Sequence, residues 1–204
     1  MRFLNFLLGF ICLFGMLSVA HLCTVKLNSI QVQENFQFDN FTESAWNTVK
    51  YNRFPTMGGR NIIPTDQQSL FGWNGTEPIV TNTVRLPKSM RFMCYSETGK
   101  VQFLDNNPAK MFLQYRNKRT KETHEQTQWV LYTDYNNIAI LYSCEAKPNE
   151  LVDGICPKDH RYLWVLAKKT ALTEAEDKLA KDMGAAVCIT ENLNTVDHLK
   201  PCKK

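Results

Sequence analysis

The sequence lacks the short motifs that identify common enzyme classes. Gly-x-Ser-x-Gly of serine hydrolases, His-Glu-x-x-His of zinc proteases and Gly-x-Gly-x-x-Gly of dinucleotide-binding proteins are all absent from its 204 residues. The four histidines, His21, His124, His160 and His198, fall in expected loops or near the termini and have no metal-ligand spacing. We therefore predict no catalytic residues, no cofactor and no enzymatic activity.

Two further absences argue against zinc and nucleic acid as ligands. No Cys-x-x-Cys pair is present, so a zinc site is not expected. The net charge is a mild +4, and the strongest basic cluster, residues 116–121, contains no aromatic side chain on which a base could stack. We interpret this cluster as a solvated loop and predict that the chain does not bind nucleic acid.

Long apolar runs are confined to the N-terminus. Arg2 is followed by an almost wholly apolar run, Phe3 to Val19, and Ser18-Val19-Ala20 has the small-x-small pattern of a cleavage site. A membrane anchor is the rival interpretation, but Asn5 interrupts the run and a cysteine-rich body follows. We therefore predict a signal peptide over residues 1–20, one domain over residues 21–204, a secreted extracellular protein and no membrane span.

Cysteine usage agrees with secretion. Of seven cysteines, Cys12 lies in the predicted signal peptide. The others are Cys23, Cys94, Cys144, Cys156, Cys188 and Cys202. An even number in a secreted chain predicts disulfides, although spacing alone does not choose the pairs. Two sequons, at Asn40 and Asn74, predict a glycoprotein, and Asn74-Gly75 is also a strong turn dipeptide.

One stretch predicts a β-hairpin. Trp129–Thr133 and Ile138–Ser143 are rich in β-branched and aromatic residues, and the four residues between them, 134–137, favour a tight turn. A helix is the rival interpretation, because neither run alternates cleanly. The shortness of both runs and the turn residues that bound them favour strands.

Further short strands are predicted before and after this hairpin, followed by one helix. The strands fall within residues 46–54, 79–86, 111–116 and 162–166. Residues 91–104 form either one bulged strand or a short hairpin, and Pro64 predicts an edge, bulge or bend. Thr173 and Glu176 form a capping box, Ala175, Leu179 and Met183 share one helix face, and Gly184 is expected to end the helix or its last full turn. About eight strands and one helix predict an all-β antiparallel barrel or sandwich.

Two passages resemble a known family. Thr133-Asp134-Tyr135 followed by Tyr142-Ser143-Cys144 resembles a lipocalin signature. The passage from Cys23 to Trp46, with its Val-x-Glu-Asn-Phe segment, resembles lipocalins of the plasma retinol-binding protein and apolipoprotein D type. Ser44 replaces the Gly of the family's Gly-x-Trp motif. The resemblance implies an eight-stranded antiparallel up-and-down lipocalin barrel with one C-terminal α-helix packed outside.

The resemblance also implies structural roles. It pairs Cys23 with Cys188, Cys94 with Cys202 and Cys144 with Cys156. It places the cation of Lys168 over the ring of Trp46 at the barrel base, where family members often have Arg.

Candidate ligand-binding residues follow from strand parity, fixed by the resemblance. The positions expected to point into the barrel are Val49, Tyr51, Ile79, Leu113, Tyr115, Val130, Tyr132, Ala139, Leu141, Tyr162 and Trp164. Trp129 and Leu131 are expected to face outward, under the helix. The plainer interpretation is that the inward residues only fill the barrel.

The leading hypothesis is a secreted carrier of a small hydrophobic molecule: a retinoid, carotenoid, bilin, sterol or fatty acid. The alternative is an interaction module in which the barrel is a scaffold and residues 55–88 contact a cell-surface receptor or a carrier protein. A lipid isomerase-type enzyme is the third hypothesis, and it is the least favoured.

Overall fold

The computed structural model describes residues 23–53, 63–88, 91–116, 123–146, 148–200 and 202. The predicted signal peptide and all of the basic cluster except Arg116 lie outside these residues.

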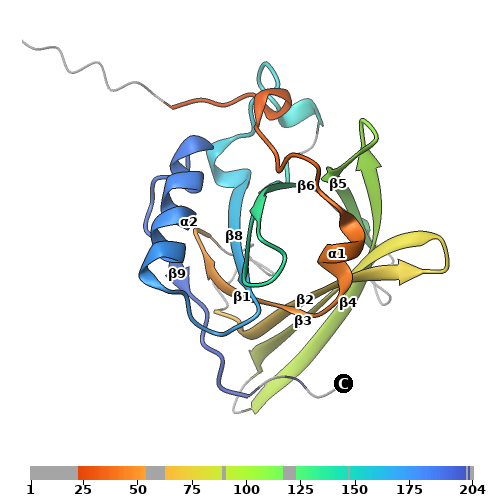
Figure 1. The fold of residues 1–204 in the computed structure, drawn as a ribbon, viewed down its shortest axis with the longest axis vertical. Coiled ribbons are helices and arrows are strands. Elements are labelled where there is room, and N and C mark those ends of the chain that lie inside the picture. The colour runs from red at the N-terminus through yellow and green to blue at the C-terminus, as the bar shows by residue number, and fades with distance from the viewer. Residues whose placement is uncertain are drawn as a thin grey trace, which may run out of the picture.

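The fold is a closed antiparallel barrel of eight strands. Each strand pairs with the next along the chain, and β1 pairs with both β8 and β2, which closes the ring (Figure 1). The barrel strands are β1 (Trp46–Tyr51), β2 (Thr65–Asn74), β3 (Glu77–Lys88), β4 (Arg91–Leu104), β5 (Asn107–Arg116), β6 (Thr123–Thr133), β7 (Ile138–Cys144) and β8 (Arg161–Ala167). A short strand, β9 (Asn194–Thr195), pairs with the outer side of β1. The predicted fold class, an up-and-down barrel, is confirmed.

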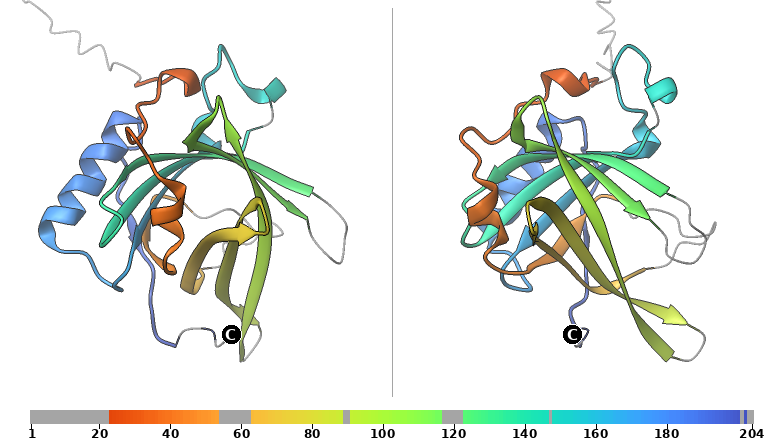
Figure 2. Two further views of the ribbon diagram at one scale, coloured as in Figure 1. Left: turned by 45° about the vertical axis from the view of Figure 1, so that its right-hand side comes forward. Right: turned by 90° about the vertical axis from the view of Figure 1, so that its right-hand side faces the viewer.

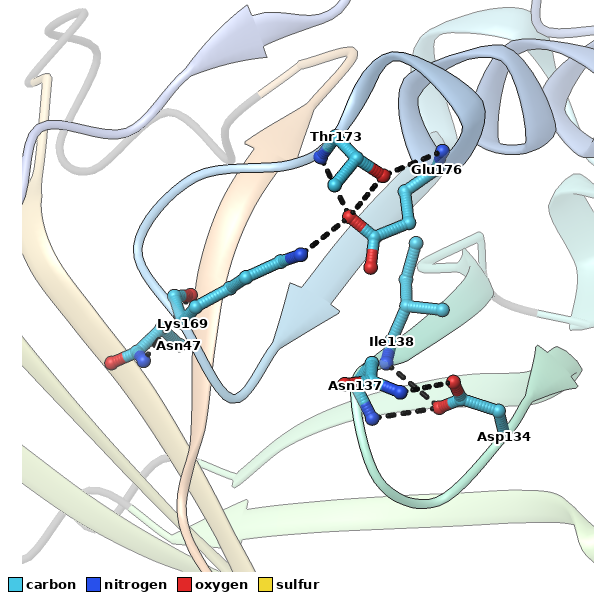
Figure 3. Close-up of polar contacts among 7 residues, drawn as sticks. All are labelled: Asn47, Asp134, Asn137, Ile138, Lys169, Thr173 and Glu176. Atoms are coloured by element: carbon cyan, nitrogen blue, oxygen red, sulfur yellow. Dashed lines mark hydrogen bonds and ion pairs between the residues drawn. The ribbon is translucent and has the colours of Figure 1, made fainter.

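The predicted hairpin is β6 and β7, and one carboxylate holds its turn. An oxygen of Asp134 accepts hydrogen bonds from the backbone N–H groups of Asn136, Asn137 and Ile138 at 3.2, 2.8 and 2.9 Å. Tyr135 adopts a positive φ of 62° within the same turn. Figure 3 shows the Asp134 carboxylate facing Asn137 and Ile138. The short polar side chain replaces ladder bonds that the turn cannot make.

The predicted helix is α2 (Glu174–Ala186), and it packs on the outside of the barrel (Figure 1). The capping box is present: the hydroxyl of Thr173 accepts from the Glu176 N–H, and the Glu176 carboxylate accepts from the Thr173 N–H (Figure 3). Lys169 forms an ion pair with Glu176 at 2.8 Å. These bonds satisfy N–H groups that the first helical turn leaves unpaired.

The inner face of α2 is centred on Ala180 and Gly184, beside the face that Leu179 and Met183 share. Ala180 and Gly184 are buried, Leu179 and Met183 are half-buried, and Ala175 is exposed. Gly184 lies in the last turn of the helix, which ends two residues later at Ala186. A Cβ at this position would lie 3.0 Å from both Leu163 Cδ2 and the Ile189 carbonyl oxygen. Gly184 therefore permits a close approach between α2 and β8.

A short helix, α1 (Phe38–Thr42), lies across one end of the barrel (Figures 1 and 2). Its Phe41 ring stacks on Trp46 with ring centroids 4.8 Å apart, and the Trp46 indole N–H donates to the Phe41 carbonyl at 3.0 Å. The Nζ of Lys168 lies 3.6 Å from the centroid of the Trp46 ring and donates to the Ser44 carbonyl at 3.1 Å. Burial lowers the pKa of Lys168. This end of the barrel is filled by aromatic rings.

Three disulfides link Cys23 to Cys188, Cys94 to Cys202 and Cys144 to Cys156. These are the pairs that the resemblance implied. The first ties the N-terminal segment, which includes the 3₁₀ turn η1 (Leu27–Ser29), to the end of α2. The third closes the β7–β8 connection, which contains η2 (Pro148–Glu150) and η3 (Lys158–His160).

The structure defines two regions for which the sequence allowed more than one form. Residues 91–104 form one continuous strand, β4, rather than a hairpin. β3 and β4 extend past the rest of the barrel as a long ribbon (Figure 2). After Pro64, β2 begins at Thr65 and has the expected irregularity, a register shift between Thr65 and Gln68.

Candidate ligand-binding site

Two apolar clusters lie on opposite faces of the sheet. One fills the barrel, and the other lies between the barrel wall and α2. Eight of the predicted inward residues belong to the barrel cluster: Tyr51, Leu113, Tyr115, Val130, Ala139, Leu141, Tyr162 and Trp164. Trp129 and Leu131 lie in the outer cluster, as expected.

Three predicted inward residues face elsewhere. Val49 and Tyr132 pack with the outer cluster, because the ladder register shifts between Thr48 and Lys50 in β1 and between Val130 and Tyr132 in β6. A bulge of this kind inserts one residue and reverses the facing of those that follow. Ile79 is half-buried, and its neighbour Val80 holds the position inside the barrel. The inward placement of these three residues was therefore predicted wrongly.

The barrel encloses a small internal space of about 50 Å³. Its walls combine apolar and uncharged polar side chains from β1, β2, β3, β5, β6, β7 and β8. The lining residues are Thr48, Gln67, Ser69, Phe71, Val80, Asn82, Tyr115, Gln126, Gln128, Leu141, Trp164 and Leu166. Only Tyr115, Leu141 and Trp164 of these belong to the predicted ligand set. Contact of these three residues with a ligand stays a prediction.

A chain of hydrogen bonds crosses one wall of this space. Ser69 Oγ bonds to Asn82 Oδ1 at 2.8 Å, and Asn82 Nδ2 donates to the Tyr115 hydroxyl at 2.9 Å. Burial raises the pKa of Tyr115 far above its usual value, so this phenol stays neutral. Gly99 makes room for the ring, since a Cβ there would lie 2.6 Å from Tyr115 Cε1. The chain thus orders three polar groups inside the barrel.

Aromatic rings form another part of the interior. Tyr162 stacks on Trp164 with centroids 5.9 Å apart and planes 14° apart, and Trp164 also packs against Tyr51 at 6.4 Å. Burial raises the pKa of Tyr162, and Glu145 adds to the effect. Flat, weakly polar rings of this kind suit an extended apolar molecule.

A titratable pair lies at the β6 and β7 ends away from α1. His124 Nε2 is 3.6 Å from Glu145 Oε1, and the interaction of the imidazole N–H with this carboxylate raises the pKa of His124. Among the described residues, no group of three or more His, Cys, Asp or Glu side chains is placed to hold a metal ion. In the same part of the chain, no helix is long and apolar enough to cross a bilayer.

Sequence reasoning missed most of the polar wall. Gln126 and Gln128 precede Val130 at inward spacing on β6, and Gln67 and Ser69 precede Phe71 in the same way on β2. Extending the inward alternation by two or four residues along each strand would have identified these polar positions.

A larger open groove, of about 510 Å³, lies between residues 30–36 and the β4–β5 turn. It shares no lining residue with the internal space.

Comparison with known proteins agrees with these features. No protein-family model matches the chain. Retinol-binding protein 4-B of Oncorhynchus mykiss is 23% identical over 179 residues, covering 87% of this chain and 97% of the relative. Insecticyanin of the tobacco hornworm Manduca sexta has a similar fold, with a TM-score of 0.60 at 15% identity over 84% of this chain and 85% of that one. Lobster apocrustacyanin A1 also has a similar fold, with a TM-score of 0.58 at 14% identity. The match covers 89% of this chain and 94% of that one.

The retinol-binding protein alignment covers 87% of the chain, and the structural neighbours share the barrel. The signature residues around Trp46 and Tyr135 lie where the barrel base and the β6–β7 turn require them. Motifs, barrel topology and relatives together support the assignment of this chain to the lipocalin family.

Proposed function

We propose that this chain is a secreted carrier that binds a small hydrophobic molecule inside the barrel. The observation that carries the proposal is the internal space at the centre of a closed barrel, lined by Phe71, Val80, Leu141, Trp164 and Leu166 together with uncharged polar groups. Apolar walls exclude water from a ligand, and a few fixed polar atoms orient it. The relative named as a retinol-binding protein supports the same function.

The size of the space sets a condition on this function. About 50 Å³ is far below the roughly 300–1,000 Å³ of typical ligand pockets. Binding therefore requires side chains to move. Gln126 is long and unbranched, so we expect rotation about its χ angles to enlarge the space without moving the barrel strands.

Secretion and glycosylation are part of the proposal. Three disulfides suit an oxidising compartment, and the N-terminal twenty residues have the pattern of a cleaved signal. Asn40 and Asn74, the sequon asparagines, are exposed, and Asn74 precedes Gly75, which has a φ of 63° in the β2–β3 turn. Both sites are therefore accessible to a glycan.

A second function is favoured by two observations. The internal space is small, and the projecting part of β4 exposes Phe92, Met93 and Tyr95, at 56%, 49% and 39% of their surface. Exposed apolar side chains close together often mark protein contacts. In this alternative the barrel is a scaffold, and a receptor or carrier protein binds the β3–β4 ribbon. We do not propose enzymatic activity.

The deciding experiment compares the mass of the deglycosylated protein, purified from its natural source, under native and denaturing conditions. A carrier gives a discrete additional mass that disappears on denaturation. The same masses under both conditions, in a protein with three intact disulfides, would contradict tight carriage and favour recognition of another protein.

A further inference from the structure

Three buried polar atoms in the internal space lack a hydrogen-bond partner among the described residues. They are Thr48 Oγ1, Gln67 Oε1 and Gln128 Oε1. Thr48 and Gln128 are only 1% and 7% exposed, and all three residues line the same space. Leaving such an atom unpaired costs about 1–3 kcal/mol, so their grouping on β1, β2 and β6 is not explained by packing.

Three other polar groups around the space are engaged with one another. Ser69, Asn82 and Tyr115 bond in series on the β2, β3 and β5 walls. The unpaired atoms are therefore a distinct set, and two of them are carboxamide oxygens that only accept hydrogen bonds. The third belongs to a hydroxyl, which both donates and accepts.

The charge of the walls restricts the chemistry of an occupant. None of the described residues that line the space carries a formal charge, since Tyr115 remains a neutral phenol. A carboxylate would be buried here without a cation, and an ammonium without an anion, and both arrangements cost much free energy. The occupant must therefore be neutral at this point.

The volume agrees with a single small polar group. A space of about 50 Å³ admits at least one water molecule, which needs roughly 10–15 Å³. The hydroxyl of a larger molecule needs about the same room as one water. The apolar body of that molecule would then lie against Phe71, Leu141 and Trp164, after the Gln126 side chain turns aside.

We propose that Thr48, Gln67 and Gln128 form a polar subsite that selects a neutral ligand bearing an O–H group, and that it discriminates an alcohol from the corresponding ether and carboxylic acid. The ligand hydroxyl donates to one carboxamide oxygen and accepts from Thr48 Oγ1. This inference rests on the proposed carrier function and restricts its ligand class to apolar alcohols.

The test uses the full secreted protein, freed of ligand, and two matched series of probes. One series is 1-dodecanol, 1-methoxydodecane and dodecanoate, and the other is retinol, retinyl methyl ether and retinoic acid. Dissociation constants are measured at pH 7.5 from the change in tryptophan emission, because Trp164 lines the space. In the series that binds, we expect the alcohol to bind about tenfold more tightly than the ether and more tightly still than the acid.

Three variants complete the test. Gln128→Met keeps the length of the side chain and removes the amide, and Thr48→Val replaces the hydroxyl by a methyl group. Gln114→Met is the matched control, because Gln114 is exposed on β5 and its amide bonds to Glu125 at 2.8 Å. We expect the preference for the alcohol to disappear in the first two variants and to persist in the control. Gln67→Met replaces either variant that fails to fold.

The outcomes separate the subsite from the carrier function. Equal affinity for alcohol, ether and acid would overturn the subsite while the carrier function stands, with water alone pairing the three atoms. A preference that survives in Gln128→Met and Thr48→Val would also overturn it. No binding of any probe, with no additional mass on the natural protein, would overturn both.

Discussion

At the scale of single residues, the barrel interior carries polar groups at a cost in stability. Gln128 is buried on β6 beside residues that pack well, yet its carboxamide oxygen has no partner among the described residues. Proteins commonly keep such groups where a ligand needs them, although an apolar residue of similar shape would stabilise the fold.

Gln128→Met tests this cost in the absence of ligand. Because Met has a similar length and no polar atom to leave unpaired, we expect the free energy of unfolding to rise by about 1 kcal/mol. The measurement is urea denaturation of the ligand-free protein, with Gln114→Met as the control that changes little. A loss of stability in Gln128→Met would mean that the amide already has its partners, which would contradict the role given to it.

His124 gives a pH-dependent contribution. The interaction of the His124 N–H with the Glu145 carboxylate raises the pKa of His124, so the folded protein holds this proton more tightly than the unfolded chain. The stabilisation is fully present below the unfolded pKa of about 6.5 and is lost as the pH rises through the higher folded pKa. The His124 side chain is 57% exposed, so screening keeps the effect below about 1 kcal/mol.

His124→Gln should therefore destabilise the protein at pH 5.5 and have little effect at pH 8.5. Urea denaturation at both pH values measures the difference. In a Glu145→Gln background the same substitution should lose its pH dependence, because the partner that raises the pKa is gone. Equal effects at the two pH values would exclude the ion pair as the cause.

At the scale of elements, the sequence predicts what is periodic or bounded by turn chemistry. The β6–β7 hairpin, the capping box of α2 and the irregular start of β2 were all predicted from local residues. The outward facing of Val49 and Tyr132 was not predicted. A one-residue bulge depends on how neighbouring strands pair and cannot be recognised from the composition of one strand. The polar wall was missed because only apolar and aromatic positions were considered as inward residues.

The packing of α2 on β8 gives a prediction at this scale. In an isolated helix Gly→Ala stabilises by up to about 1 kcal/mol. At Gly184 the new Cβ would lie 3.0 Å from Leu163 Cδ2 and from the Ile189 carbonyl oxygen, and the backbone atom cannot turn aside as a side chain does. We expect Gly184→Ala to destabilise the protein by about 1–2 kcal/mol.

Thermal unfolding followed by circular dichroism measures this loss. Gly72→Ala is the matched control, because nothing lies within 4 Å of a Cβ at that position. If Gly184→Ala were as stable as the control or more so, α2 would have to shift away from β8 at little cost.

At the scale of the whole molecule, the strand pairing that closes the barrel does not hold the two ends of the chain. The N-terminal segment and the C-terminal tail lie outside the ring of strands, and each is tied to a distant part of the chain (Figure 2). Asp66 assists the C-terminal tail: its backbone N–H donates to the Asp197 carbonyl and its carboxylate accepts from the Lys200 N–H, each at 2.8 Å. Disulfides and hydrogen bonds therefore hold both chain ends to the barrel.

The disulfides should contribute unequally to the stability of the folded protein. Cys23–Cys188 spans 165 positions and Cys144–Cys156 spans 12. Because closing a longer loop removes more entropy from the unfolded chain, the chain-entropy model gives about 5 kcal/mol for the first and about 3 kcal/mol for the second. Replacing each pair by alanines and measuring guanidinium denaturation should reproduce this order. The reverse order would mean that Cys144–Cys156 acts chiefly on the folded β7–β8 connection, since a constraint on the unfolded chain favours the longer loop.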